Sequence, residues 1–136
     1  MPKRILVVDD HAPTRSFVRS VLESEKAERY VVLEAATGAD CLKAFDAHRP
    51  FDLVILDVGL PDLDGYAVCR ALRSVDKDVP IVFVTGRSDI KDFSLGREAG
   101  SDSYIVKPIA RGALRSMVTL FTSVGRRKAG QDAGAP

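Results

Sequence analysis

Four short apolar runs in this chain of 136 residues each end at a polar side chain that could take part in chemistry. Runs of this kind, bounded by turn-forming residues, are typical of strands buried on both faces of a parallel sheet. The carboxyl ends of parallel strands lie at one edge of the sheet, so we expect the polar side chains to converge there. In chain order they are Asp9 and Asp10, Asp57, Thr85, and Lys107.

The chemistry of this set depends on its three carboxylates. Two unit charges about 4 Å apart repel by roughly 4 kcal/mol at an effective dielectric of about 20, so Asp9, Asp10 and Asp57 together require a cation. Ligands that are all oxygen favour Mg²⁺, and Mn²⁺ would also fit. Lys107 would bring a second positive charge. A hard cation and an ammonium group around a carboxylate form a site for phosphoryl transfer onto that carboxylate. Asp57 considered alone would be an ordinary solvated residue at the end of a strand.

The elements that would position these side chains alternate between strand and helix five times. Such alternation favours an α/β fold with a doubly wound, five-stranded parallel sheet and helices on both faces. We expect the flavodoxin-like order 2-1-3-4-5, which would place the ends of the first and third strands side by side. The predicted strands cover residues 4–9, 30–35, 52–57, 81–85 and 103–106. The predicted helices cover about residues 13–22, 38–45, 65–74, 88–99 and 110–124. Thr37 and Asp64 are the expected N-caps of the second and third helices.

The predicted helices differ in quality. The first buries an apolar stripe and turns Arg15 and Arg19 to the other side. The fourth, at 88–99, is marginal because Gly96 interrupts it and few of its residues are apolar. Residues 125–136 are small, basic and rich in glycine and alanine, which favours a disordered C-terminal tail or linker after one domain at residues 1–124.

Composition argues against several classes of function. A formal net charge of +1 gives no general attraction to nucleic acid or to a membrane surface. No apolar run approaches the length of a membrane span and no signal-peptide pattern opens the chain, so we expect a cytoplasmic protein. Cys41 and Cys69 lack metal-ligand spacing and are expected to be buried thiols. The basic residues 126–128 are interpreted as a solvated end, not as a nucleic-acid contact.

Together these motifs resemble the receiver domain of two-component response regulators over about residues 3–124. The resemblance implies that Asp57 accepts a phosphoryl group from a sensor histidine kinase, a histidine phosphotransfer protein or a small acyl phosphate. The domain would be a switch that controls a partner or output domain. It would support its own phosphorylation and dephosphorylation without acting on external substrates. The motifs that match the family in order and approximate spacing are Asp9-Asp10, Asp57, the loop from Pro61 to Gly65, Thr85 and Lys107-Pro108.

The resemblance also implies a set of metal ligands. Asp10 and Asp57 would bind Mg²⁺ through their side chains, the backbone carbonyl of Gly59 would be a third ligand, and Asp9 would act through a water molecule. Position 59 is often larger in the family, so a glycine leaves the phosphoryl group more open. Arg87 could reach across that opening.

The remaining residues would form the switch. Lys107 would hold a phosphoryl oxygen, and its bond to Pro108 is expected to be cis. Thr85 would move its hydroxyl onto the phosphoryl group, and Tyr104 would turn inward behind it. The changing surface would be the helix at 88–99, the fifth strand and the last helix. The partner could also be a second copy of the chain, in a phosphorylation-dependent homodimer.

Three alternatives remain open. The chain could be the receiver part of a DNA-binding transcriptional regulator, although no helix-turn-helix follows in this sequence. It could be a phosphatase that forms an aspartyl phosphate, but such enzymes need an acid/base Asp where this chain has Gly59. It could be an interaction module on the same fold without phosphorylation, which the complete set of acidic residues disfavours.

Overall fold

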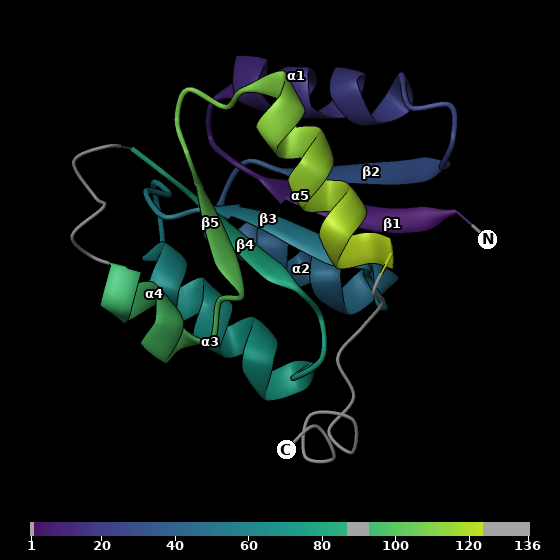
Figure 1. Ribbon diagram of the computed structural model, residues 1–136. Coiled ribbons are helices and arrows are strands. Elements are labelled where there is room, and N and C mark those ends of the chain that lie inside the picture. The colour runs from purple at the N-terminus through teal and green to yellow at the C-terminus, as the bar shows by residue number, and fades with distance from the viewer. Residues whose placement is uncertain (1, 87–92, 124–136) are drawn as a thin grey trace, which may run out of the picture.

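The computed structural model describes residues 2–86 and 93–123, in which five strands alternate with five helices (Figure 1). The strands are β1 (Lys3–Val8), β2 (Tyr30–Ala35), β3 (Leu53–Asp57), β4 (Ile81–Thr85) and β5 (Ser103–Val106). The helices are α1 (Ala12–Glu23), α2 (Gly38–His48), α3 (Gly65–Val75), α4 (Phe93–Ala99) and α5 (Arg111–Ser123). Within the described residues, each predicted element is present with small shifts at its ends.

The strands form one parallel sheet in the order β2-β1-β3-β4-β5, which confirms the predicted topology. The register pairs Val8 with Leu56, Asp57 with Val84, and Thr85 with Val106, so the strand ends line up along one edge. Helices α1 and α5 cover one face of the sheet, and α2, α3 and α4 cover the other (Figure 1).

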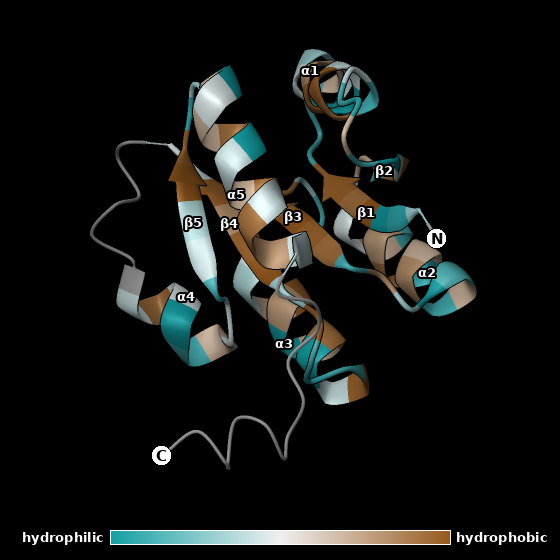
Figure 2. Ribbon diagram, turned by 45° about the vertical axis from the view of Figure 1, so that its right-hand side comes forward, coloured by the Kyte–Doolittle hydropathy of each residue, from teal (hydrophilic) through white to brown (hydrophobic). Residues whose placement is uncertain are grey.

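The core lies on both faces of the sheet because β3 and β4 are buried and are apolar up to their last residues, Asp57 and Thr85. All five residues of β3 and all five of β4 are buried. Alternate side chains point to opposite faces, as the pleat requires, so Leu56 packs toward α2 and α3 while Ile55 packs toward α1 and α5. Figure 2 shows β3 and β4 as hydrophobic strands between the helical layers. This double burial explains why their sequences are continuous apolar runs.

Local side chains cap the helices next to the carboxyl edge. Thr37 Oγ1 accepts from the Asp40 N–H at 3.0 Å, and Asp64 Oδ1 accepts from the Tyr66 N–H at 3.0 Å, which confirms both predicted N-caps. A contact that was not predicted also occurs here. The carboxylate of Asp62 accepts from the N–H groups of Gly38 at 2.7 Å and Ala39 at 3.0 Å, and so fastens the loop after β3 to the start of α2.

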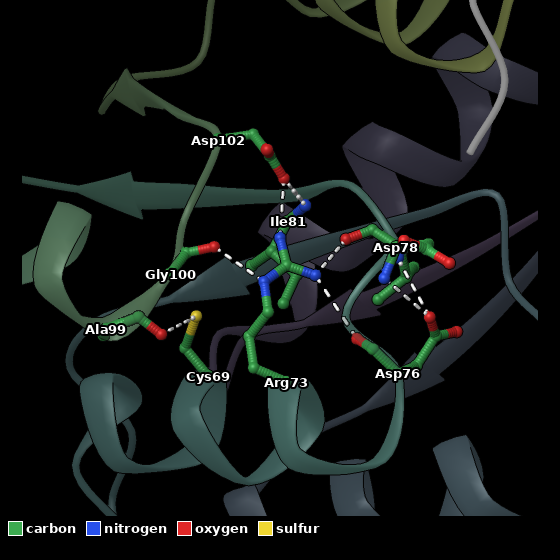
Figure 3. Close-up of polar contacts among 9 residues, drawn as sticks. Cys69, Arg73, Asp76, Asp78, Ile81, Ala99, Gly100 and Asp102 are labelled. Atoms are coloured by element: carbon green, nitrogen blue, oxygen red, sulfur yellow. Dashed lines mark hydrogen bonds and ion pairs between the residues drawn. The ribbon is translucent and has the colours of Figure 1, made fainter. Parts of the chain in front are cut away.

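A polar cluster at the amino ends of β4 and β5 holds α3 and the end of α4 together (Figure 3). Arg73 donates to the carbonyls of Gly100, at 2.8 Å, and Val79, and to Asp102 Oδ2 at 2.8 Å. The same carboxylate oxygen accepts from the Ile81 N–H at 2.8 Å. Gly100 ends α4 with a φ of +105°, where a Cβ would come within 2.9 Å of Arg73 Cγ. Glycine is therefore required at this turn.

Some sequence predictions fall at or beyond the limits of the described residues. Helix α4 begins at Phe93, so the first part of the predicted helix 88–99 lies outside them, as do Arg87 and the predicted tail at 125–136. Cys41 and Cys69 are buried free thiols, as expected, and burial raises their pKa values to about 12 and about 11. No helix in the part of the chain that the structure describes is long and apolar enough to cross a membrane.

Candidate functional site

Asp57 is the last residue of β3 and lies at the centre of the carboxyl edge, with only 7% of its surface exposed. The central position of β3 in the sheet places β1 on one side of this carboxylate and β4 on the other. Asp57 Oδ1 accepts from the Gly59 N–H at 3.1 Å, and Oδ2 accepts from Lys107 Nζ at 3.3 Å. The carboxylate is therefore held by one neutral and one charged donor.

The acidic pair that follows β1 is divided into a buried and an exposed residue. Asp9 is buried and Asp10 is exposed. Asp9 Oδ1 accepts from the His11 N–H at 2.9 Å, whereas Asp9 Oδ2 lies 3.0 Å from Lys107 Nζ without the geometry of a hydrogen bond. Asp9, Asp10 and Asp57 each offer one carboxylate oxygen, and these oxygens lie within 4.8 Å of one another. The structure therefore brings the three acids together, as the sequence predicted.

Lys107 completes the cluster from the end of β5. Its ammonium forms ion pairs with Asp9 and Asp57, and its backbone N–H donates to the Thr85 carbonyl at 2.8 Å. The bond between Lys107 and Pro108 is cis, which confirms that prediction. The hydrogen bond between the Lys107 backbone and Thr85 thus fixes the segment from which the Lys107 amine extends to the acids.

The electrostatic balance of the cluster is negative. Burial raises the pKa of Asp57, and the charge of Asp9 raises it further, while the Gly59 N–H and the Lys107 amine lower it; the net shift is upward. Burial lowers the pKa of Lys107, but its contacts with Asp9 and Asp57 raise that pKa by more, so the amine remains charged. Three carboxylates around one ammonium leave negative charge in excess among the described residues.

This donor set fits a hard divalent cation. The oxygens are carboxylates at one solvent-accessible edge, which is the ligand chemistry that Mg²⁺ prefers. Asp9 Oδ2 is a buried oxygen with no hydrogen-bond partner among the described residues, although Lys107 Nζ lies 3.0 Å from it, so it can still accept a hydrogen bond. Gly59 is exposed, and a Cβ placed on it would meet nothing within 4 Å, so the backbone there is open to solvent as expected.

Thr85 is the last residue of β4, and Tyr104 lies on the neighbouring strand β5 opposite Phe83. The hydroxyl of buried Thr85 donates to the Gly86 carbonyl at 3.2 Å. Tyr104 is 43% exposed, so its ring is not in the inward position. Both residues line a cavity of about 460 Å³, together with Phe83 and Gly96. The structure therefore provides a space next to Thr85 that an aromatic ring could enter.

Sequence reasoning missed Arg15, whose side chain contacts the backbone of Asp9 in the acidic cluster. Arg15 Nη1 donates to the Asp9 carbonyl at 2.7 Å, and Arg15 Nε donates to Glu34 Oε1 at 3.0 Å. The helical pattern placed Arg15 only on the polar side of α1. An arginine one turn after an acidic pair is the one signal in the sequence that could have indicated this contact.

Comparison with known proteins agrees with this geometry. Residues 5–119 match the family described as Response regulator receiver domain. The chain belongs to this family. The resemblance predicted from the motifs is thereby confirmed, and the family is one whose members bind Mg²⁺ at an acidic pocket.

Individual relatives are regulatory proteins. It is 39% identical over 129 residues to the transcriptional regulatory protein AfsQ1 of Streptomyces coelicolor, a match that covers 94% of this chain and 54% of AfsQ1. A putative response regulator from Chloroflexus aurantiacus has a TM-score of 0.82 at 32% identity, covering 90% of this chain and 99% of that one. The BeF3-activated DrrB receiver domain has a TM-score of 0.78 at 32% identity, with the same coverage. The chain spans about half the length of the curated relatives it matches.

Proposed function

We propose that this chain is a phosphorylation-dependent signalling switch that accepts a phosphoryl group on Asp57. One observation supports it above all: the buried carboxylate of Asp57 lies beside Lys107 Nζ at 3.3 Å, with carboxylate oxygens of Asp9 and Asp10 within 4.8 Å. A sensor histidine kinase or a histidine phosphotransfer protein would supply the phosphoryl group, and a small acyl phosphate could replace them. Relatives that are response regulators support a kinase as the partner.

In the proposed reaction a carboxylate oxygen of Asp57 attacks the phosphorus of the donor. The bond from phosphorus to the donor's nitrogen, or to its acyl oxygen, breaks, and the phosphoryl group remains on Asp57 as an acyl phosphate. Water later hydrolyses this bond and restores the carboxylate. Lys107 contributes a charged amine that can donate to a phosphoryl oxygen in place of its present contact with Asp57.

Mg²⁺ would be held by the side chains of Asp10 and Asp57 and by the carbonyl of Gly59, while Asp9 would act through a water molecule. The cluster of three acids supports this set. When bound, Mg²⁺ offsets the negative charge of the acids and of the incoming phosphoryl group. Asp9 is already engaged by the His11 N–H and by Lys107, which agrees with an indirect role.

Phosphorylation changes the surface of α4, β5 and α5 through Thr85 and Tyr104. A phosphoryl group adds charge and three acceptor oxygens, to which Thr85 and Lys107 can each donate one hydrogen bond. Bonds to a charged group contribute about 1.5–3 kcal/mol each, so two approach the ~5.5 kcal/mol that inverts a 1:99 equilibrium. When Thr85 moves, Tyr104 enters the neighbouring cavity. Leu95 and Leu120 are exposed on the same surface, where a partner, an output domain or a second copy would dock.

The relatives favour one version of this function. Since AfsQ1 and the ycf27 proteins are transcriptional regulators about twice as long as the matched region, this chain corresponds to the receiver part of such proteins. In this version the receiver controls a DNA-binding module without touching DNA itself. Members of the family are generally not enzymes acting on external substrates, and Gly59 stands where aspartyl-phosphate phosphatases carry an acid/base Asp.

The proposal is tested by incubating the chain with acetyl phosphate and Mg²⁺ and measuring its intact mass. We expect the mass of one phosphoryl group to be added, and we expect EDTA or Asp57→Asn to prevent the addition. A wild-type chain that gains no phosphoryl group under these conditions refutes the proposal. Amide NMR of the phosphorylated Thr85→Ala variant tests the switch separately: shifts along 93–106 that equal those of phosphorylated wild type exclude the coupling through Thr85.

A further inference from the structure

We infer that Arg15 is a positioning residue for the cation site, an inference that rests on the proposed function. Arg15 lies in the first turn of α1, and its guanidinium reaches back to the end of β1. Nη1 donates to the Asp9 carbonyl at 2.7 Å, while Nε donates to Glu34 Oε1 on β2 at 3.0 Å. The planar guanidinium therefore joins three elements at the acidic edge: β1, β2 and α1.

The backbone of Asp9 is held on both sides by this arrangement. Its N–H donates to the Ala35 carbonyl at 3.1 Å, and its carbonyl accepts from Arg15. That carbonyl belongs to the peptide bond that leads into Asp10, so Arg15 fixes the orientation of that peptide. The His11 N–H, which belongs to the peptide bond that follows Asp10, donates to Asp9 Oδ1 at 2.9 Å. The backbone on both sides of Asp10 is thus constrained.

Asp10 depends on its backbone for its position. Its side chain is exposed, and its carboxylate makes no hydrogen bond or ion pair within residues 2–86 and 93–123. A carboxylate without partners of its own turns among its rotamers, so the backbone alone fixes the position and direction of the Cα–Cβ bond from which it reaches a cation. Arg15, which holds the preceding peptide, consequently determines how well the Asp10 carboxylate meets a cation shared with Asp57.

The charge of Arg15 and its positioning role have opposite effects on Mg²⁺ binding. A guanidinium near a cation site repels the cation, and Glu34 reduces this repulsion because its carboxylate contacts Arg15 directly. If Arg15 acted only through its charge, removing it would strengthen Mg²⁺ binding. If Arg15 acts by positioning, removing it weakens Mg²⁺ binding. The sign of the change therefore distinguishes the two roles.

The chain provides a matched control one turn further along α1. Arg19 donates to the same carboxylate, with Nε 2.6 Å from Glu34 Oε2, and to the Val32 carbonyl at 2.9 Å. Like Arg15 it joins α1 to β2, but none of its hydrogen bonds reaches Asp9 or Asp10. Arg19→Met therefore removes a comparable contact between helix and sheet without touching the acidic backbone.

The experiment measures the dissociation constant of Mg²⁺ by amide NMR titration for wild type, Arg15→Met and Arg19→Met. We expect Arg15→Met to bind Mg²⁺ about fivefold more weakly, on the scale of one lost hydrogen bond, and Arg19→Met to stay within about twofold of wild type. Phosphorylation by acetyl phosphate gives the second readout. In Arg15→Met its half-saturating Mg²⁺ concentration should rise about fivefold, with a near-normal rate at saturating Mg²⁺.

Each outcome decides between the alternatives. If Arg15→Met binds Mg²⁺ as tightly as Arg19→Met, or more tightly than wild type, the inference is overturned. If circular dichroism shows that Arg15→Met is unfolded, Arg15→Lys is compared with Arg19→Lys, because lysine keeps the charge but lacks the planar fork. The same fivefold loss is then expected for Arg15→Lys alone, and equal affinities overturn the inference. A wild-type chain that binds no Mg²⁺ overturns the proposed function as well, whereas normal wild-type binding with an unaffected Arg15 variant overturns only the inference.

Discussion

Replacing Arg73 by Met tests what holds α3, β4 and β5 together. The guanidinium of Arg73 donates to Asp102 at 2.8 Å and to the Gly100 carbonyl at 2.8 Å, and also to the Val79 carbonyl (Figure 3). The two charged side chains are nearly buried, with 13% of Arg73 and 12% of Asp102 exposed. Methionine keeps an unbranched apolar chain and removes every one of these hydrogen bonds.

The magnitude follows from the burial of the ion pair. Removing one partner of a buried pair costs about 3–5 kcal/mol, because the other charge stays buried. We expect the lower end, about 3 kcal/mol, since both side chains retain slight exposure and Asp102 still accepts from the Ile81 N–H. In a domain of this length the melting temperature falls by roughly 3–5 °C per kcal/mol, so about 10–15 °C is expected. Asp102→Asn keeps an acceptor for Ile81 and should cost only about 1.5 kcal/mol.

Urea unfolding of the two single variants and the double variant measures the coupling between Arg73 and Asp102. We expect the double variant to lose less stability than the sum of the single variants, with a coupling energy of about 1.5 kcal/mol. Arg70→Met, at an exposed arginine of the same helix, should change the free energy of unfolding by less than about 0.5 kcal/mol. Additive single-variant effects, or Arg73→Met as stable as Arg70→Met, would refute the reasoning.

Three further predictions concern the carboxyl edge. Lys107→Met removes the ammonium that contacts Asp57, and phosphorylation by acetyl phosphate, followed by intact mass, should slow by about tenfold or more; an unchanged rate contradicts the role of the amine. Gly65→Ala would place a Cβ 2.7 Å from the Asp57 carbonyl oxygen. Its free energy of unfolding in urea should fall by about 1–3 kcal/mol, although alanine is the better helix former. The Cβ of Gly59→Ala meets nothing within 4 Å, so its free energy of unfolding should change little. Equal stability of these two glycine variants would be inconsistent with the close approach. The hydrogen bond from Arg19 lowers the pKa of Glu34 by more than burial raises it. The stabilisation by the Glu34 carboxylate is therefore present above its unfolded pKa of about 4.3 and is lost as the pH falls through the lower folded pKa. The stability difference between wild type and Glu34→Gln should therefore shrink as the pH falls below about 4.3, and a difference that is constant with pH contradicts this.

The parts of the fold that the sequence predicts are those that depend on burial. The continuous apolar runs of β3 and β4 are diagnostic because both faces of the sheet are covered. Once the strands are parallel, the residue after each apolar run must lie at the same edge, which is why Asp57 and Lys107 were correctly expected to meet. The flavodoxin-like strand order, which was expected because it brings the ends of the first and third strands together, was confirmed.

The parts that could not be predicted are long polar side chains that satisfy distant backbone groups. Arg73 and its partner Asp102 are 29 residues apart in sequence, and Arg15 reaches Glu34 on a strand 19 residues later. A periodic pattern assigns such residues only to the polar side of a helix, since it contains no information about which carbonyl lies within reach. The end of the predicted helix at Ala99 agrees with the structure, while residues 88–92 lie outside the described residues and that part of the helix stays a prediction.

The two edges of the sheet differ in how completely their charges are compensated. At the amino edge the Arg73 guanidinium meets one carboxylate and several carbonyls, so charge and hydrogen bonds balance inside the protein. At the carboxyl edge three acids lie together, and the Lys107 amine forms ion pairs with two of them, Asp9 and Asp57. Uncompensated buried charge lowers stability, and it persists where an external partner completes it. The imbalance at Asp57 therefore supports the proposal that a cation and a phosphoryl group bind at this edge, while the Arg73 cluster stabilises the fold at the opposite edge.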